Sequence, residues 1–263
     1  MISYTLYKHD TSKEWVTFVH GAGGSSAIWY KQIRAFQEHF NVLLLDLRGH
    51  GASNKTKAAT HKNAYTFQSI VDDVLEVMEH LKLINSHFVG ISLGTIVIRK
   101  LAENHPEKVK SMILGGAILK MNFRSQILMR LGTIFKYILP YLVLYKFFAF
   151  VIMPRKNHKQ SRNLFINEAK KVYKKEFIKW FKLTAEINPV LKWFRQVELN
   201  IPTLYIMGEE DYLFLPSVKQ VAENHYKTAK LFVFQNCGHV VNLDQAALFN
   251  QKVIAFIKNS LER

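Results

Sequence analysis

His87-Phe88-Val89-Gly90-Ile91-Ser92-Leu93-Gly94-Thr95 is the most informative segment of this chain. It reads as an apolar strand that ends in Gly-x-Ser-x-Gly and continues directly into a helical pattern. A serine between a strand and a helix lies on a sharp, strained turn, so the residues two positions away on each side must be very small. Gly90 and Gly94 meet that demand. Ser92 is therefore a candidate nucleophile, provided that the rest of the chain supplies the matching sheet and partner residues.

Length and composition set the broad class of the protein. Hydrophobic residues make up 49% of the 263 positions, enough to fill the core of one large α/β domain or of two small ones. Cys237 is the single cysteine, which excludes an intramolecular disulfide and fits a reducing compartment. The segment from Met1 to Trp15 lacks the basic stretch and apolar run of a signal peptide. The sequence thus predicts a cytoplasmic protein that is not secreted.

The net charge of +16 is distributed unevenly along the chain. Residues 119–196 contain 17 Lys or Arg and only 3 Asp or Glu, whereas the remainder is nearly neutral. A basic surface of this kind attracts nucleic acid, acidic substrates or anionic lipid. No recognised nucleic-acid-binding motif accompanies the charge, so nucleic acid is not an expected partner.

Short apolar runs alternate with helical patterns over most of the chain. The predicted strands are residues 2–7, 15–20, 42–45, 88–91, 109–114, 203–207 and 231–234, and the predicted helices include 67–81, 95–104, 218–222 and a final one through 247–257. This alternation predicts an α/β fold with a mostly parallel, doubly wound sheet covered on both faces. It stops between residues 119 and 196. We therefore expect a core formed by residues 1–118 and 197–263, and a helical insert between them.

Outside the insert the chain resembles the α/β-hydrolase family. The resemblance rests on five segments that have the expected order and context, namely His20-Gly21-Ala22-Gly23-Gly24, Asp46-Leu47-Arg48-Gly49-His50-Gly51, the Ser92 turn, Gly208-Glu209-Glu210-Asp211 after a strand and Cys237-Gly238-His239 after the last strand. The order Ser, Asp, His along the chain is the one that this fold uses. Few residues precede the first His-Gly strand, so the leading antiparallel hairpin of the family looks shortened.

The resemblance implies a role for each motif residue. Ser92 would be the nucleophile, His239 its general base, and Asp211 the group that orients the imidazole. The oxyanion hole would consist of the backbone N–H groups of Ala22 and Leu93. Dehalogenases and epoxide hydrolases of this fold carry aspartate at the nucleophile position, so a serine disfavours both. The implied serine hydrolase needs no metal and no organic cofactor.

Several other polar residues in these loops have alternative interpretations. Glu209 and Glu210 compete with Asp211 as the acid, and the family pattern Gly-x-x-Asp favours Asp211. His20 and His50 are predicted to bond loop backbone rather than to act in catalysis. Arg48 either braces its loop or meets an acidic substrate, and Cys237 is predicted to be a small core residue.

In hydrolases of this fold, an insert at the position of residues 119–196 forms a cap over the active site. Between Ile127 and Met153 its only charged residues are Arg130, Lys136 and Lys146. A single membrane span there would separate Ser92 from the other two members of the triad and prevent the sheet from closing. Pro140 instead predicts two shorter helices in a hairpin.

The second half of the insert reads as an amphipathic helix. On a helical wheel, its apolar side contains Ala169, Val172, Tyr173, Phe177, Trp180 and Phe181, and its basic side contains Lys170, Lys171, Lys174, Lys175, Lys179 and Lys182. This pattern is typical of a helix that lies in a membrane interface, in this case peripherally at the inner membrane face. The alternative is that the aromatic side packs onto the hydrolase body and the lysines are only solvated.

Together these features predict a serine hydrolase that cleaves a carboxylic ester with a hydrophobic acyl group, such as a lipid ester or a monoacylglycerol. We expect Gly21, Gly23, Ile91 and Val240 to line its substrate pocket. The same motifs suit a thioesterase, an amidase, a C–C bond hydrolase or an acyltransferase, because fold does not fix the substrate. A non-catalytic ligand-binding protein or a membrane-surface protein is the alternative of another class. The oligomeric state is left open.

Overall fold

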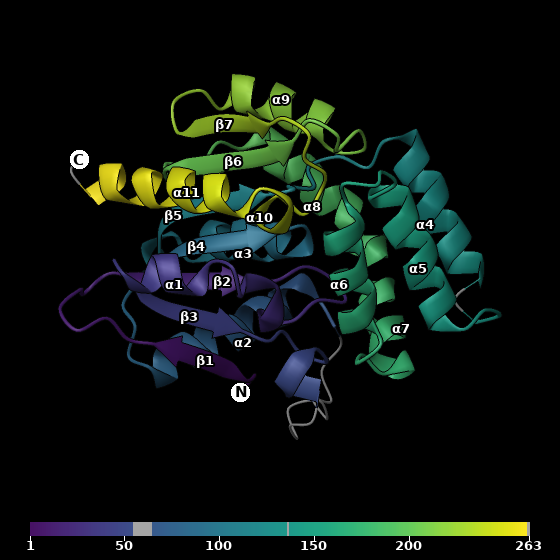
Figure 1. The fold of residues 1–263 in the computed structure, drawn as a ribbon, viewed down its shortest axis with the longest axis horizontal. Helices are drawn as coiled ribbons and strands as arrows, with labels where there is room; N and C mark the ends of the chain where they lie inside the picture. Colours follow the sequence, from purple (N-terminus) through teal and green to yellow (C-terminus); the bar gives the residue numbers. More distant parts are fainter. Residues whose placement is uncertain (55–64, 136, 262–263) are drawn as a thin grey trace.

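The computed structural model describes residues 1–54, 65–135 and 137–261. These residues form one seven-stranded sheet with the order β1-β3-β2-β4-β5-β6-β7 (Figure 1). The strands are β1 (Tyr4–Tyr7), β2 (Trp15–Val19), β3 (Asn41–Leu45), β4 (Ser86–Ile91), β5 (Val109–Gly115), β6 (Thr203–Gly208) and β7 (Ala229–Phe234). β1 pairs antiparallel with β3, and all other neighbours pair in parallel. The mostly parallel sheet that the sequence predicts is confirmed, with a single antiparallel strand in place of a leading hairpin.

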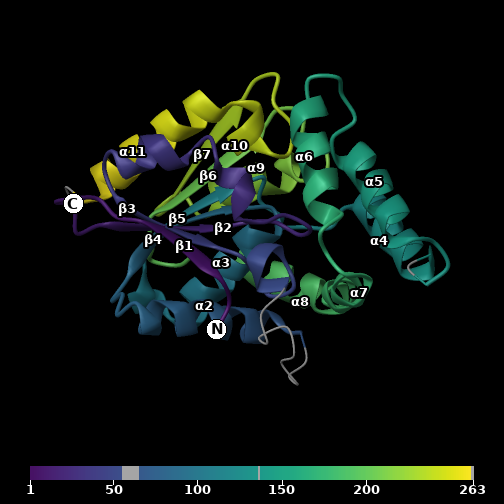
Figure 2. The same cartoon turned by 60° about the horizontal axis from the view of Figure 1, so that its bottom comes forward.

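Helices cover both faces of the sheet, as Figure 2 shows. The helices of this layer are α1 (Ile33–Gln37), α2 (Phe67–His80), α3 (Leu93–Asn104), α9 (Leu215–Asn224), α10 (Val241–Asp244) and α11 (Ala246–Leu261), together with short 3₁₀ turns at Ser26–Trp29, Gly51–Asn54 and Pro106–Lys108. Helices α2, α3 and α9 pack in one apolar cluster, and α1 and α11 pack in another. The central strands are therefore buried on both sides, which explains their continuous apolar runs.

Strand β4 illustrates how the sequence produces this arrangement. Successive side chains of a strand point to opposite faces, so Phe88 packs with α2 and α3 while Val89 packs with α1 and α11. The carboxyl ends of the parallel strands meet at one edge of the sheet. The residues that follow β4, β6 and β7 are thereby brought together from distant parts of the chain.

The insert, residues 119–196, lies between β5 and β6 and contains five helices in its described part. They are α4 (Phe123–Phe135), α5 (Tyr141–Ile152), α6 (Lys159–Ala169), α7 (Lys174–Lys182) and α8 (Thr184–Gln196). In Figure 1, helices α4 to α7 lie beside the edge of the sheet where β4 and β6 end. Pro140 is the residue before α5, so it divides the apolar run into two helices as predicted. None of the helices among the described residues is both long and apolar enough to cross a bilayer.

The expectation of one continuous amphipathic helix through residues 169–182 is wrong. α6 ends at Ala169, and α7 begins after Tyr173, whose backbone is extended (φ −71°, ψ 146°). A straight helix would separate Ala169 from Phe181 by roughly 18 Å. The break lets both side chains pack in one cluster with Leu144 and Tyr145 of α5. Tertiary packing, not helical periodicity, therefore determines the path of the chain here.

Candidate active site

Ser92 lies on a strained turn between β4 and α3. Its backbone has φ 55° and ψ −120°, a conformation that side-chain-bearing residues rarely adopt. A Cβ atom on Gly94 would lie 2.2 Å from the carbonyl oxygen of Val19, and one on Gly90 would lie 2.6 Å from the Ile98 side chain. Glycine at position 94 is thus a steric requirement of this turn, and a side chain at position 90 would crowd Ile98 and, at 3.0 Å, the backbone of Gly94.

The structure brings Ser92, His239 and Asp211 together. The Ser92 Oγ lies 2.9 Å from Nε2 of His239, although the two residues are 147 positions apart in sequence. Nδ1 of the same imidazole lies 2.7 Å from Oδ2 of Asp211. Asp211 follows β6, and His239 lies in the loop after β7. The three side chains form a continuous hydrogen-bonded series at the carboxyl edge of the sheet.

The partners of His239 determine its tautomer. A carboxylate only accepts hydrogen bonds, so Nδ1–H donates to Asp211 and Nε2 is left to accept the Ser92 hydroxyl proton. Asp211 is buried, and its Oδ1 also accepts the backbone N–H of Phe214. The ring of Phe214 lies 5.3 Å from that of His239 and shields one side of it. This geometry suits a general base whose orientation is fixed by a buried acid.

Glu210, a competing acid in the sequence, faces away from the imidazole of His239. Its carboxylate is buried and contacts three residues of the insert, Arg155, Asn157 and His158. Burial disfavours the charged form, but the hydrogen bonds of Asn157 and His158 and the charge of Arg155 outweigh it and lower the pKa of Glu210. Glu210 therefore joins the insert to the loop that carries Asp211.

The segment after β2 passes close to Ser92. A Cβ atom on Gly21 would lie 3.1 Å from the Ser92 Cβ and from the Ile91 carbonyl oxygen, so a side chain there would crowd the turn. Leu93 is the first residue of α3, where backbone N–H groups have no acceptor within the helix. The N–H groups of Ala22 and Leu93 are thus carried by the two segments that meet at Ser92. Their assignment as an oxyanion hole remains a prediction.

Two buried histidines hold the Gly21–Gly24 segment. Nε2 of His50 accepts the backbone N–H of Gly23 at 3.0 Å, and Nε2 of His20 accepts that of Leu47 at 3.0 Å. Their Nδ1 atoms lie within hydrogen-bond distance of the carbonyl oxygens of Arg48 and Gly21. Burial, with the neighbouring His20 as a smaller cause, lowers the pKa of His50 to about 3, and burial also lowers that of His20. Both rings are therefore neutral and able to accept, and the prediction that they bond loop backbone is confirmed.

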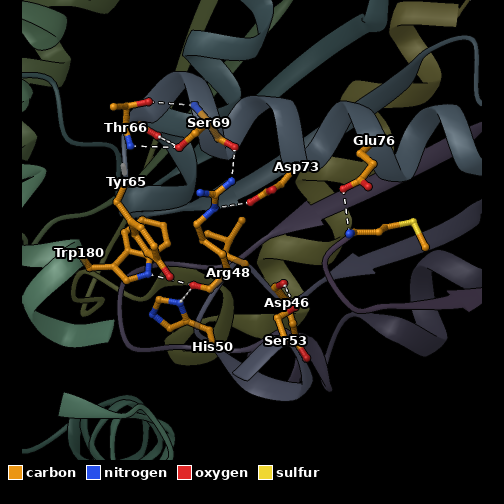
Figure 3. Close-up of polar contacts among 12 residues, drawn as sticks. Asp46, Arg48, His50, Ser53, Tyr65, Thr66, Ser69, Asp73, Glu76 and Trp180 are labelled. Atoms are coloured by element: carbon orange, nitrogen blue, oxygen red, sulfur yellow. Dashed lines mark hydrogen bonds and ion pairs between the residues drawn. The ribbon is translucent and has the colours of Figure 1, made fainter. Parts of the chain in front are cut away.

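Arg48 braces its loop. Its guanidinium pairs with Asp73 and donates to the carbonyl oxygen of Ser69 on α2 (Figure 3). The Arg48 side chain is only 4% exposed, so it does not face an acidic substrate. The Trp180 indole N–H, from α7 of the insert, donates to the Arg48 carbonyl oxygen at 3.0 Å. The loop thus connects the core, the insert and the segment around Ala22.

An apolar cavity of about 220 Å³ lies beside Ser92 and His239. Its lining from the insert includes Leu128, Met129, Tyr145, Phe148, Phe177, Trp180 and Phe181. Of the residues predicted to line the pocket, Gly21, Ile91 and Val240 do so. Gly23 does not, because the ring of Tyr145 packs directly against it and its N–H bonds to His50. Apolar periodicity marks the insert residues as buried but carries no signal of which cavity they face.

Three further expectations concern the insert and Cys237. Lys170, Lys171, Lys174, Lys175 and Lys182 are exposed, while Lys179 is partly buried and pairs with Glu176. The aromatic side chains of α7 face inward. Trp180 packs on the core, as in the alternative to a membrane helix, whereas Phe177 and Phe181 pack against α5 of the insert. Cys237 is a buried core residue, and burial raises the pKa of its thiol.

Within the described residues, no three His, Cys, Asp or Glu side chains are grouped to hold a metal ion.

Comparisons with known proteins agree with the fold. Residues 14–132 match the family model described as the alpha/beta hydrolase fold. A relative from Bacillus subtilis, named the uncharacterized carboxylesterase nap, is 23% identical over 92% of this chain and 78% of its own length. The 3-oxoadipate enol-lactonase 2 of Acinetobacter baylyi is 31% identical, but that match spans 40% of this chain and only 37% of the enol-lactonase. A hydrolase structure from Oleispira antarctica superposes with a TM-score of 0.81 at 18% identity, covering 98% of this chain and 95% of that one.

Proposed function

We propose that this chain, which belongs to the α/β-hydrolase fold family, is a serine hydrolase that cleaves carboxylic esters with a hydrophobic acyl group. Ester hydrolysis in general is the activity that its esterase and lactonase relatives support. The observation that carries the proposal is the series Ser92–His239–Asp211, with distances of 2.9 and 2.7 Å, at the wall of an apolar cavity.

In the proposed reaction, His239 takes the hydroxyl proton of Ser92 as its oxygen attacks the ester carbonyl carbon. The negative charge that develops on the carbonyl oxygen is met by the N–H groups of Ala22 and Leu93, each worth about 3–4 kcal/mol of transition-state stabilisation. The imidazolium then protonates the leaving alkoxide, which departs and leaves an acyl-enzyme. Water, deprotonated by His239, releases the acid and restores Ser92.

The lining of the cavity supports a hydrophobic acyl group as the substrate portion next to Ser92. Phe148, Phe181 and Leu128 offer apolar surface and no charge, so a charged acyl chain would lose its hydration without a partner. A lipid ester or a monoacylglycerol meets this requirement. Thioesters, amides, C–C bonds and acyl transfer would use the same three side chains, so they form the comparison set for the substrate test.

A fluorophosphonate probe tests the nucleophile. We expect the probe to label the wild-type protein at Ser92, as identified by peptide mapping, and to leave Ser92→Ala unlabelled. Ser260→Ala removes a hydroxyl that bonds to the Ile257 carbonyl oxygen on α11, outside the site, and serves as the matched control. Labelling at another serine, or none in a folded protein, would reject the assignment.

A substrate panel tests the reaction. Purified protein is given p-nitrophenyl esters of increasing acyl length, a monoacylglycerol, an acyl thioester and an acyl amide. We expect the highest kcat/KM with apolar acyl esters and complete loss of turnover in Ser92→Ala. Binding of these compounds without turnover would support the alternative of a ligand-binding protein. Equal kcat/KM values for short and long acyl chains would argue against a hydrophobic acyl group in the substrate.

A further inference from the structure

Helices α4 and α5 carry a row of exposed apolar side chains on the side away from the cavity. On α4 they are Phe123, Ile127 and Ile134, and on α5 they are Val143, Phe147 and Phe150. Their exposed fractions range from 40% for Ile127 to 75% for Phe123. The spacing within each helix places these residues on one side of it. We call this surface the outer face of the α4–α5 hairpin.

The opposite side of the same two helices is also apolar. Leu128 and Met129 of α4, and Tyr145 and Phe148 of α5, line the cavity beside Ser92. A helix that is hydrophobic all round is normally enclosed by protein or lies in a membrane, and here one side remains exposed. An exposed apolar surface of this extent on a single structural unit marks an interaction site.

The charges around this surface identify the kind of partner. Tyr141, the first residue of α5, donates from its hydroxyl to the carbonyl oxygen of Lys170 and packs against Phe177 of α7. The exposed side chains of Lys170, at the end of α6, and of Lys174 and Lys175, the first residues of α7, therefore lie around the turn that adjoins the start of α5. Positive charge thus lies at one end of the outer face, beside the start of α5.

The acidic side chains described in the insert point inward and do not cancel this charge. Glu168 is 5% exposed and accepts from Ser25 of the core, and Glu176 is fully buried. A second copy of the chain placed on this face offers the same positive charge and no exposed acidic side chain of the described insert to pair with it. An anionic bilayer offers both an apolar interior and negative head groups, so it complements the face in both respects.

We propose that the outer face of the α4–α5 hairpin docks on an anionic lipid bilayer, with its apolar side chains in the interface and Lys170, Lys174 and Lys175 on the head groups. The docking itself does not depend on catalysis. It adds to the proposed function, since the helices that touch the bilayer also line the cavity of Ser92 and would lie where a lipid ester resides. The sequence predicts membrane contact through the aromatic side of residues 169–182. The aromatic side chains of α7 are buried, so the proposed contact lies on α4 and α5 instead.

Vesicle co-sedimentation tests the docking. The Ser92→Ala variant of the 263-residue chain is mixed with phosphatidylcholine vesicles and with phosphatidylcholine vesicles that contain phosphatidylglycerol. We expect binding to the anionic vesicles at low ionic strength, much weaker binding to the neutral ones, and weakening by salt. Because the variant lacks the proposed nucleophile, this result is independent of whether the protein hydrolyses esters.

Two sets of variants locate the surface. Ile134→Ser with Phe147→Ser removes apolar side chains of the outer face, and Ile84→Ser with Tyr226→Ser is the matched pair on the core, where these two residues are 78% and 73% exposed. A second set removes three positive charges near the start of α5, with Lys170→Gln, Lys174→Gln and Lys175→Gln. Its control removes three positive charges from the core, with Lys219→Gln, Lys227→Gln and Lys230→Gln. We expect each insert set to weaken binding by about tenfold or more. The core sets should change it by less than about twofold.

Three results would overturn the proposal. The first is no binding of the Ser92→Ala protein to either vesicle. The second is equal weakening by the insert sets and their core controls. The third is a concentration-dependent dimer in light scattering that Ile134→Ser with Phe147→Ser converts to a monomer, since the outer face would then bind a second copy. Circular dichroism of each variant verifies that it is folded.

Discussion

Nε2 of His158 lies 2.7 Å from Oε2 of Glu210, and this contact joins the insert to the loops of the triad. Glu210 directly precedes Asp211, and His158 packs against Gly238, the neighbour of His239. A Cβ atom on Gly238 would lie 2.7 Å from the His158 ring, so the contact leaves no room for a side chain there. The start of α6 thus touches the segments that carry both the acid and the base.

Glu210→Gln should destabilise the protein and impair turnover. The amide keeps the shape but loses the charge that pairs with Arg155 and the second acceptor oxygen that Asn157 and His158 use. We expect a loss of about 1–3 kcal/mol in the free energy of unfolding at pH 7, measured with urea. The kcat/KM for a p-nitrophenyl ester should fall as well. Exposed Glu209→Gln is the control and should change neither quantity.

This effect of Glu210 should depend on pH. Its pKa is lowered in the folded protein, so its stabilisation is present above the ordinary carboxyl pKa and is lost as the pH falls through the lowered one. The difference in unfolding free energy between wild type and Glu210→Gln should therefore stay constant from pH 7 to about pH 5 and shrink below about pH 4. A difference that grows with acidification would contradict this role.

Ser92→Gly should stabilise the protein while abolishing turnover. Ser92 holds φ at 55° and ψ at −120°, which costs a side-chain-bearing residue roughly 1 kcal/mol or more and costs glycine little. We expect the unfolding midpoint in urea to rise in Ser92→Gly. Ser92→Ala keeps a Cβ atom and so retains the strain, which makes it the control. An equal midpoint in the two variants would show that the turn stores no strain.

His50 should make the stability of the protein sensitive to acid. Burial lowers its folded-state pKa to about 3, whereas in the unfolded chain it takes up a proton below about pH 6.5. The unfolded state then binds more protons, so stability falls as the pH decreases through that range, by about 1.4 kcal/mol per pH unit for this group. We expect His50→Asn to give a shallower fall than wild type between about pH 6.5 and pH 4 in urea unfolding. His80→Asn on the exposed side of α2 is the control, and an unchanged slope in His50→Asn would refute the assignment.

Leu128→Trp should shorten the acyl chain that the enzyme accepts. Leu128 lines the cavity from α4, and an indole there would fill part of its volume of about 220 Å³. We expect kcat/KM for a dodecanoyl ester to fall by about tenfold or more relative to a butanoyl ester, since each excluded methylene costs about 1 kcal/mol or more. Ile127→Trp changes the adjacent side chain, which is 40% exposed and does not line the cavity. A parallel loss in both variants would mean that the cavity does not hold the acyl chain.

The sequence reveals the structural position of those residues whose type is required by the local backbone geometry. Gly94 would collide with the Val19 carbonyl oxygen if it carried a side chain, so its presence two positions after Ser92 already implies the turn. The alternation of buried runs predicts the parallel sheet, and the sheet brings the ends of β4, β6 and β7 to one edge. For these reasons the meeting of Ser92, Asp211 and His239 is foreseeable.

The insert is less predictable because its helices are apolar on more than one side. Periodicity does not tell whether Phe147 or Phe148 faces the cavity, and only contact with α7 makes Phe148 the inward residue. The break at Tyr173 is likewise invisible in the pattern, since it depends on packing between Ala169 and Phe181. The partnership of Glu210 with His158 joins residues 52 positions apart and has no local signature.

The sequence by itself determined the order of the strands along the chain, the strained turn at Ser92 and the identity of its two candidate partners, because backbone sterics and strand periodicity are local properties. Only the tertiary structure decided which side of each insert helix is buried, that Arg48 and Glu210 are structural, and that an apolar surface remains exposed on α4 and α5. Those outcomes depend on contacts between distant segments. Each such segment has several apolar residues that could be buried or several charged residues that could pair. The packing of the folded chain determines which of them do so.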